Sequence, residues 1–498
     1  IRFGRKSWPD EPGDMSSLIT PGLLSLMPTW LSSKNNWIWI GLIAVAATIG
    51  IFASLNFDLT IYLALALLAL LLVLMFLRPL WGLISILIIP PAPAIFGQTL
   101  TLPLPLKENL TINLASVLAL VVIAWVIFYL FKNQVSLKSI PLVWPFLILL
   151  TAGLISIIVS ADRFISAAEW IRWLSIFGIF LIAFDLARRT GQGRRIIGAI
   201  AVSAGIPCAV SLWQLLSGRG IYEISTGLTR VYGTFGQPNS LAFYLVLAAA
   251  GLIIFWQTIP GQKPLNPWWL LIPAAVILPI LFFTYARGAW LALLMILIIL
   301  GIQRWRWKFV IILLIVAAAA GLFILFNSQN TRVTEFNITR TDFYQRVVAL
   351  FDFQEYSSST SWRIRSWTDM ITNAFPEKPW LGYGPGMYIP TNLIVHGYLE
   401  GALEAHNDYL LILIETGLIG LAAYLFLIFS TIKKTVQAAG EDTGNKKKTA
   451  WIVTATLIAI FIMSFSDNIL RVTALQWALW SLVAVVLATE RQKAKGKR

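Results

Sequence analysis

Residues 291–300 read LALLMILIIL and residues 61–77 read IYLALALLALLLVLMFL, so neither run leaves a polar face on a helix. A surface helix of a soluble protein would place polar side chains along one side of such a run. The rest of the chain is similar, because 58% of its 498 residues are hydrophobic, 12% are charged and the mean hydropathy is +0.77. We therefore expect an all-α polytopic membrane protein.

Apolar runs alternate with loops along the chain, which predicts about 12–14 transmembrane helices and one large extracytoplasmic loop that contains short helices. Residues 285–288 are expected to form a tight turn between two of these helices. The expected divisions are a cytoplasmic N-terminal segment (1–36), a transmembrane bundle (37–326), the large loop (327–405), C-terminal transmembrane helices (406–489) and a basic cytoplasmic tail (490–498). The expected spans are 37–55, 59–77, 80–96, 111–131, 141–159, 165–187, 195–217, 239–259, 268–284, 288–302, 309–326, 408–432, 449–466 and 472–489.

The net charge of +15 comes from basic residues that are dispersed among the loops, so we expect no nucleic-acid partner. Most of the 38 lysines and arginines lie on one side if the N-terminus is cytoplasmic, which predicts an N-in, C-in chain. The large loop, the loop at 218–238 and the turn at 285–288 then share the external face. The single cysteine, Cys208, excludes an intrachain disulfide and a thiol-based metal site.

His406 stands where the large loop meets an apolar span, in the stretch Glu404-Ala405-His406-Asn407-Asp408-Tyr409. A histidine titrates near neutrality and can take a proton from a hydroxyl, so this position suggests chemistry at a membrane surface. An interfacial histidine held by Glu404, Asp408 or a backbone carbonyl is the alternative. The other histidine, His396, has no comparable setting and is interpreted as a loop residue. No His, Cys, Asp or Glu cluster has metal-ligand spacing, so we expect no metal and no cofactor.

Three arginines on the expected external face are candidates for binding a phosphate group: Arg230, Arg287 and Arg363. Arginine forks bind phosphate oxygens with two parallel hydrogen bonds, whereas the positive-inside rule disfavours arginine on this side. An interfacial anchor is the alternative for Arg287. Near Arg230, Asn239 is expected to cap the helix that follows it.

Two further patterns lie in the large loop. The stretch around residues 361–371 predicts a helix that lies on the bilayer or caps the bundle, with one apolar stripe of Ile364, Trp367, Met370, Ile371 and Ala374. Arg363 is expected on the membrane-facing or core-facing side of this helix and not on its solvent side. Residues 379–386 read PWLGYGPG, which favours a tight turn over a phosphate-binding loop because no Lys-Ser/Thr pair follows.

Four motifs occur in a fixed order: a Gly…Pro-Asn segment at 232–239, a Thr-x-x-Arg-Gly turn at 284–289, Arg363-x-x-x-Trp367 followed by 379–386, and His406-Asn407 followed after nine residues by Gly-x-x-Gly at 417–420. Together they cover about residues 220–425 and resemble the O-antigen ligase and O-antigen polymerase superfamily. The preceding spans resemble that family only in hydrophobicity.

The resemblance implies a GT-C-like membrane enzyme that transfers a glycan from an undecaprenyl-diphosphate carrier to an acceptor hydroxyl, with inversion and without a metal. His406 would be the general base, and Arg230, Arg287 and Arg363 would hold the diphosphate. Four further residues would contact these catalytic and binding side chains without touching the substrate: Glu404, Asn407, Asp408 and Asn239. The partners implied are the lipid-linked donor, a glycan or lipid A-core acceptor and the bilayer, and the site would face the periplasm from the bacterial inner membrane.

Several alternatives stay open at this point. An O-antigen polymerase would use the same chemistry with another lipid-linked repeat as acceptor, and a single large loop favours a ligase. An anion transporter of the bicarbonate type would use the arginines differently, although the relatives with that label lack the histidine motif. A structural scaffold would explain neither the arginines nor the loop.

Overall fold

A computed structural model describes residues 74–89, 91, 99–104, 107–223, 228–257, 271–305, 359–396, 404–441 and 444–496. This part of the chain is mostly helical, which confirms the expected fold class, and it adds two small antiparallel hairpins. The N-terminal segment 1–36, the expected spans 37–55 and 309–326, most of 59–77 and residues 327–358 of the large loop lie outside the described residues. The expected domain boundaries stay predictions.

The helices follow the apolar runs, and the hairpins occupy loops between them. The elements are α4 (Pro79–Ile88), β1 (Thr99–Leu104), β2 (Lys107–Asn113), α5 (Leu114–Lys132), α6 (Val143–Ile158), α7 (Arg163–Thr190), α8 (Gly193–Ser203), α9 (Gly205–Leu216), β3 (Ile221–Glu223), β4 (Leu228–Arg230), α10 (Pro238–Gln257), α11 (Leu271–Phe283), α12 (Arg287–Trp305), α15 (Ser359–Asp369), α16 (Tyr388–His396), α17 (Asp408–Glu441), α18 (Gly444–Met463) and α19 (Thr473–Gly496).

Within the described residues, four helical stretches are long and apolar enough to cross a membrane: Arg163–Thr190, Gly193–Leu216, Pro238–Gln257 and Asp408–Gly440. Six more apolar helices are shorter than this. The expected span 195–217 divides into α8 and α9 at Ala204, and α4 covers only the first part of the expected span 80–96. Prolines at 90, 91 and 93 explain the short α4, since each lacks the N–H that would continue a helix.

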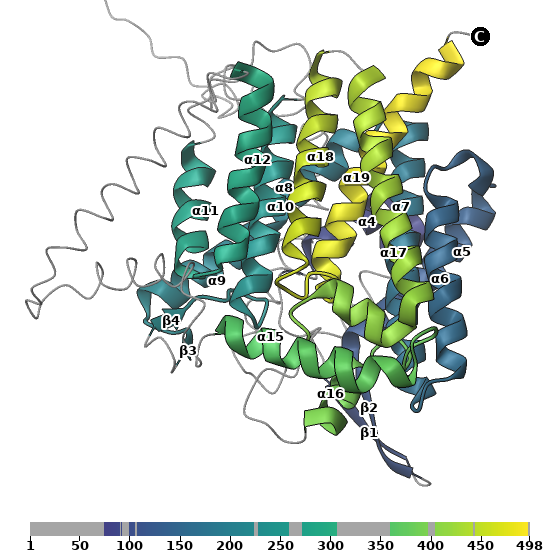
Figure 1. Cartoon of the computed structure of the whole chain (residues 1–498). Helices are drawn as coiled ribbons and strands as arrows, with labels where there is room; N and C mark the ends of the chain where they lie inside the picture. Colours follow the sequence, from purple (N-terminus) through teal and green to yellow (C-terminus); the bar gives the residue numbers. More distant parts are fainter. Residues whose placement is uncertain are drawn as a thin grey trace, which may run out of the picture.

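Helix α7 lies inside the bundle and packs against α19 on one side and α5 on the other (Figure 1). Asp162 caps its first turn by accepting hydrogen bonds from the backbone N–H groups of Phe164 and Ile165, and Gly191 ends it in the left-handed region. The ring of Phe180 is completely buried and meets Trp480 edge-on at 6.2 Å. This packing fixes the helix whose first turns reach the candidate site.

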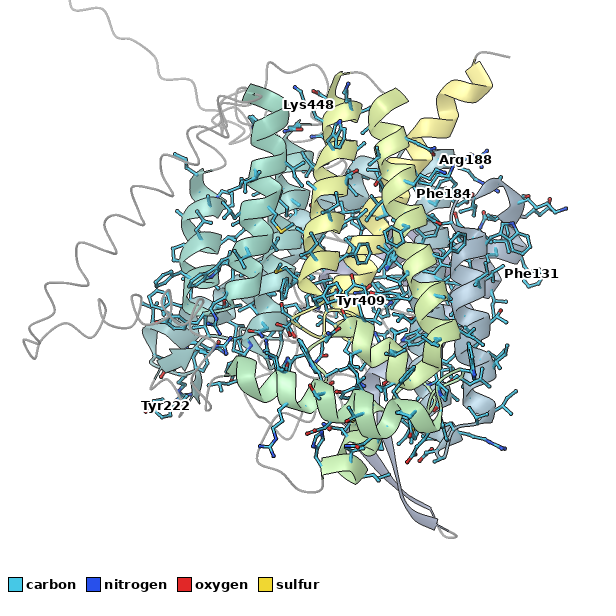
Figure 2. All side chains as sticks on the ribbon, viewed as in Figure 1. Phe131, Phe184, Arg188, Tyr222, Tyr409 and Lys448 are labelled. Atoms are coloured by element: carbon cyan, nitrogen blue, oxygen red, sulfur yellow. The ribbon has the colours of Figure 1, made fainter. Side chains whose placement is uncertain are left out.

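The turn expected between α11 and α12 is confirmed, and Tyr285 takes a left-handed backbone there with φ 51°. The hairpin β3–β4, helices α15 and α16 and the hairpin β1–β2 all lie at one end of the bundle, together with Tyr222 (Figures 1 and 2). Arg188, Lys448 and the C-terminus lie at the other end. The described part of the large loop and the loop at 218–238 thus share one end, and which side of the membrane that end faces stays a prediction.

Candidate active site

Helix α15 runs across the end of the bundle and ties the large loop to it (Figure 1). The predicted helix is confirmed, but the buried stripe is narrower than expected, because Ile364 and Ile371 are about half exposed while Met370 and Ala374 are buried. A π-helical turn at Met370–Ala374 changes the phase of the helix at this point. Arg363 faces inward as predicted, and one of its terminal N–H groups donates to the Ser466 carbonyl at 3.0 Å.

His406 and Asn407 are the two residues directly before α17. Asn407 caps that helix, since its side-chain oxygen accepts from the N–H groups of Tyr409 and Leu410, both at 3.0 Å. His406 itself has φ 45°, in the left-handed region that side chains with a Cβ rarely adopt. The neighbouring Asp408 N–H donates to the Ser464 carbonyl at 2.8 Å, and Trp367 Nε1 donates to the Ala405 carbonyl at 2.7 Å. These bonds hold the strained residue from both sides.

The imidazole of His406 faces Asp467, with 3.5 Å between Nδ1 and Oδ1. Both side chains are largely buried, at 15% and 13% exposure. Asn239 Nδ2 donates to the other oxygen of Asp467 at 2.6 Å, and Arg230 donates to the Asn239 oxygen at 2.7 Å. Arg230, Asn239, Asp467 and His406 therefore form one series of polar contacts, although they come from three separate parts of the chain.

Asn239 does not cap its helix as predicted, because α10 already begins at Pro238. Its amide instead links two side chains that lie far away in the sequence. Arg230 also donates through Nε to the Thr284 carbonyl at 2.8 Å, so it joins the turn between α11 and α12 to the same series. The contact of Arg230 with a diphosphate stays a prediction.

Arg287 is the first residue of α12, directly before Gly288. A Cβ on Gly288 would lie 3.5 Å from Ser466 Oγ, so the start of α12 packs closely against the residue that Arg363 contacts. The structure thus brings the regions of all three predicted arginines to residues 464–472, the segment between α18 and α19 that we call the connector.

The connector supplies two residues that the sequence reasoning missed, Asp467 and Arg471. They stand in the short polar stretch SFSDNILRV (464–472), between the expected spans 449–466 and 472–489. The predicted topology placed this stretch on the external face, where an arginine is disfavoured. That signal could have marked Arg471, whereas nothing local in the sequence pairs Asp467 with His406.

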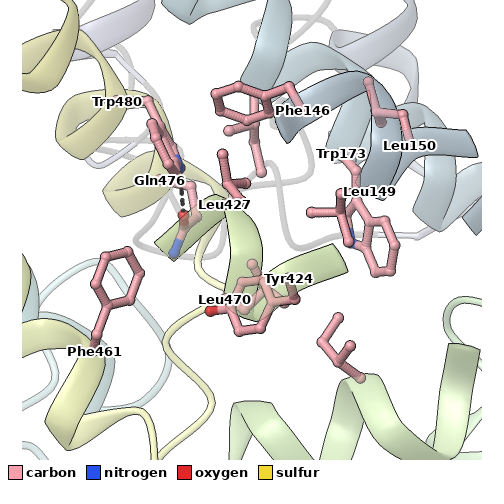
Figure 3. Close-up of a pocket in the computed structure, with 12 residues that line it drawn as sticks. Phe146, Leu149, Leu150, Trp173, Tyr424, Leu427, Phe461, Leu470, Gln476 and Trp480 are labelled. Atoms are coloured by element: carbon pink, nitrogen blue, oxygen red, sulfur yellow. Dashed lines mark hydrogen bonds between the residues drawn. The ribbon is translucent and has the colours of Figure 1, made fainter. Parts of the chain in front are cut away.

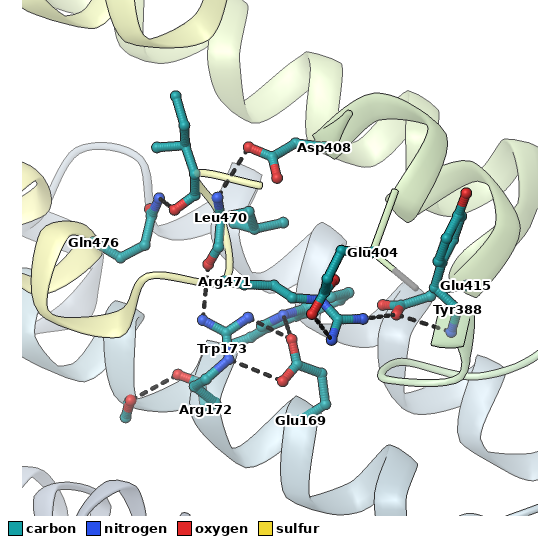
Figure 4. A network of polar contacts seen from close by, with 12 residues as sticks. Glu169, Arg172, Trp173, Tyr388, Glu404, Asp408, Glu415, Leu470, Arg471 and Gln476 are labelled. Atoms are coloured by element: carbon teal, nitrogen blue, oxygen red, sulfur yellow. Dashed lines mark hydrogen bonds and ion pairs between the residues drawn. The ribbon is translucent and has the colours of Figure 1, made fainter. Parts of the chain in front are cut away.

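A network of charged side chains surrounds the far half of the connector (Figure 4). Arg471 forms ion pairs with Glu404 at 3.4 Å and with the fully buried Glu415 at 3.0 Å. Arg172 pairs with Glu169 and donates to the Leu470 carbonyl at 2.8 Å. The backbone N–H of Leu470 donates to Asp408 at 2.9 Å.

Two of the expected supporting residues, Glu404 and Asp408, therefore contact the connector. The prediction that one of them orients the imidazole is untested. The carboxylate that faces His406 Nδ1 at 3.5 Å is that of Asp467.

The glycine-rich stretch 379–386 packs into a break in α17. Gly417 has φ 66° and ψ −167°, and a Cβ there would lie 2.2 Å from the Trp380 carbonyl carbon. The Leu418 N–H donates to the Pro379 carbonyl at 2.8 Å, and the Gly384 N–H donates to the Glu415 carbonyl at 2.8 Å. These glycines allow close backbone packing, as the turn interpretation predicted, and they fix the direction of the helix that follows His406.

An apolar pocket lies behind the connector, between α6, α7, α17, α18 and α19 (Figure 3). Aromatic rings such as Phe146, Trp173 and Trp480 line it, and the amide of Gln476 lies at its edge and accepts a hydrogen bond from Trp480 Nε1. A dianionic group would lose its hydration there without gaining a partner. The lining of this pocket therefore does not suit a charged substrate group.

Metal ligation has no candidate among the described residues, since no group of three or more His, Cys, Asp or Glu side chains could hold an ion there. The absence of a metal and of a cofactor from the reaction stays a prediction. The chemistry that the described geometry offers is proton transfer at His406 next to arginines that suit an anion.

Comparison with known protein families identifies a similarity over part of the chain. The family model described as O-antigen ligase matches residues 270–425, which include Arg287, Arg363 and His406. No curated protein sequence matches the chain. Arg230, Asn239 and Asp467 lie outside the matched stretch and join it only in three dimensions. Over residues 270–425 this helical membrane protein is therefore similar to the O-antigen ligase family.

Proposed function

We propose that this protein transfers a glycan from an undecaprenyl-diphosphate carrier to an acceptor hydroxyl, at the end of the bundle where α15 lies. The O-antigen ligase match supports a function of the ligase or polymerase type in general. The observation that carries the finer proposal is the contact of His406 with Asp467, in a series that continues to Asn239 and Arg230. A neutral imidazole held in this way is suited to deprotonating a hydroxyl.

In the proposed reaction, the acceptor oxygen attacks the anomeric carbon of the donor sugar and the bond from that carbon to the diphosphate oxygen breaks. The acceptor proton passes to Nε2 of His406, because Nδ1 faces Asp467. The diphosphate leaves with the bonding electron pair, and the anomeric configuration inverts because the acceptor attacks the face opposite to the diphosphate. The 3.5 Å between Nδ1 and Oδ1 is longer than a formed hydrogen bond, and such contacts shorten when substrate binds.

Charge is distributed unequally around His406, which suggests where each substrate binds. Arg363 and the start of α12 meet Ser466 of the connector, and Arg230 reaches Asp467 through Asn239. The carboxylates of Glu404 and Glu415 lie near its Arg471 end. A diphosphate would have to compete with these carboxylates for Arg471, so we place the donor on the side of His406 where Arg230 and Arg363 lie.

The proposal is tested by reconstituting the purified protein in liposomes with an undecaprenyl-diphosphate-linked oligosaccharide and candidate acceptors. We expect a glycosylated acceptor whose new linkage has the inverted anomeric configuration, and we expect His406→Ala to form it roughly 10²- to 10⁴-fold more slowly. Wild-type transfer by that variant would refute the assignment of His406. Ion flux across the same liposomes without any lipid-linked sugar would favour the anion transporter instead.

The choice between ligase and polymerase depends on the acceptor. We favour a ligase because the sequence has one large loop and one smaller loop at 218–238, which the hairpin β3–β4 partly occupies. Lipid-linked glycans isolated from a deletion strain separate the two functions. Full-length chains left on the carrier indicate a lost ligase, whereas single repeats indicate a lost polymerase.

A further inference from the structure

Arg471 contacts the chain on both sides of His406. Its guanidinium pairs with Glu404, two residues before the histidine, at 3.4 Å. It also pairs at 3.0 Å with Glu415, which lies on α17 just before the break at Gly417. One side chain therefore holds the segment that enters the histidine and the helix that leaves it.

Arg471 belongs to the same short connector as Asp467, which faces His406. The segment between them is anchored independently of both, because the Leu470 carbonyl accepts from Arg172 and its N–H donates to Asp408. Arg172 is in turn paired with Glu169 on α7. The connector is thus a fixed support from which Asp467 faces the imidazole and Arg471 reaches the carboxylates of Glu404 and Glu415, one on either side of it along the chain.

The ion pair between Arg471 and Glu415 is hard to replace because Glu415 is both charged and buried. Glu415 is completely buried, and removing its cation would leave a carboxylate without a charged partner in an apolar helix. Burial by itself would lower the pKa of Arg471, but Glu415, Glu404 and other nearby carboxylates outweigh burial and raise it above its ordinary value. Arg471 therefore remains a cation at any pH at which the protein would be assayed.

We propose that Arg471 is a positioning residue, which sets the distance between His406 and Asp467 by fixing Glu404 and Glu415 to the connector. This rests on the proposed function of His406. The backbone of His406 is left-handed, so it stays in place only while the surrounding contacts hold it. Arg471 would act through His406 and would not touch the donor diphosphate.

The test compares Arg471→Gln, Arg471→Lys and Glu404→Gln with wild type, using transfer kinetics with varied lipid-linked donor. Arg189→Gln is the matched control, because it breaks an ion pair with the buried Asp185, and the neighbouring Arg188 lies at the other end of the bundle (Figure 2). We expect Arg471→Gln to lower kcat by up to about a hundredfold, since a displacement of about 1 Å at a catalytic group can cost that much, with little change in the donor KM. Arg471→Lys and Glu404→Gln should lower kcat less, and the pH profile of kcat should move in all three.

A second measurement does not depend on activity. Hydrogen–deuterium exchange should become faster over residues 404–416 in Arg471→Gln, while residues 193–216 exchange as in wild type. Arg189→Gln should leave exchange at 404–416 unchanged.

Three results would overturn the inference: a wild-type kcat in Arg471→Gln, a loss confined to the donor KM, or equal losses in Arg471→Gln and Arg189→Gln. A wild-type protein that transfers nothing would refute the proposed function, and the exchange experiment would still decide whether Arg471 holds residues 404–416. Unchanged exchange there in Arg471→Gln refutes the positioning role.

Discussion

Two histidine–aspartate pairs occur in the described part of this protein, and their distances are the same. His406 Nδ1 lies 3.5 Å from Asp467, and His396 Nδ1 lies 3.5 Å from Asp369. The two histidines are about equally buried, at 15% and 14% exposure. His396 ends α16 and Asp369 ends α15, so the second pair joins two helices of the large loop.

The two aspartates differ in burial and in the side chains that donate hydrogen bonds to them. Asp467 is 13% exposed and accepts from Asn239, which Arg230 holds in turn. Asp369 is 34% exposed, and no second side chain among the described residues donates to it in this way. A buried carboxylate that accepts a hydrogen bond from a second side chain keeps the imidazole oriented. A carboxylate that is one-third exposed is hydrated and can rotate. The pair distance alone therefore does not identify a catalytic histidine.

The largest expected effect separates the two histidines. His406→Ala should lower transfer by roughly 10²- to 10⁴-fold, because a general base contributes about that much. His396→Ala should stay near the wild-type rate, since its pair only joins two surface helices. Transfer by both variants is measured in liposomes at equal protein amounts. Equal losses of transfer would show that the His406–Asp467 pair has no catalytic role that the His396–Asp369 pair lacks.

The two aspartates give the next largest difference. Asp467→Asn keeps the size of the side chain but removes the charge that faces Nδ1, so we expect kcat to fall by up to about 10²-fold as the imidazole loses its orientation. Asp369→Asn serves as the control and should change kcat little. Single-turnover measurements with bound donor provide the rates, and a wild-type kcat in Asp467→Asn would contradict the role of the connector.

Two arginines on α15 test how the connector is held. Arg363 donates to the Ser466 carbonyl, next to Asp467, whereas Arg365 is exposed on the same helix. Arg363→Gln should lower kcat/KM at least about tenfold, because a hydrogen bond from a charged group contributes about 1.5–3 kcal/mol and about 1.4 kcal/mol is a factor of ten. Arg365→Gln should have little effect. Similar values for the two variants would mean that α15 needs only positive charge at this end.

The smallest effect is expected at Asn239. This residue donates to Asp467 of the His406 pair and has no counterpart at Asp369 of the His396 pair among the described residues. Asn239→Ala leaves the Asp467 carboxylate without its 2.6 Å donor, and a hydrogen bond to a charged group contributes about 1.5 kcal/mol at the lower end of its range, so kcat should fall about tenfold. Asn239→Asp should be worse than the alanine variant, because it would place a second carboxylate against Asp467. An aspartate variant as active as wild type would exclude the series Arg230–Asn239–Asp467 from the reaction.

Much of the fold could be predicted because its causes are local. Apolar runs gave the helices, and the Tyr285 turn and the α15 helix were confirmed. The division of the span 195–217 at Ala204 was missed, since hydrophobicity continues without a break across it. The predicted Asn239 cap was wrong. The Asn239 amide donates to Asp467 instead, and this contact exists only in the folded chain.

The sequence by itself determined that this is a helical membrane protein and that His406 stands at a loop-to-helix junction, because hydrophobicity and spacing are properties of neighbouring residues. Only the tertiary structure decided which groups surround His406. Asp467 lies 61 positions further along the chain, and Asn239 lies 228 positions before Asp467. Contacts over such separations depend on how helices pack against one another, and that packing brought the connector, with Asp467 and Arg471, to the histidine.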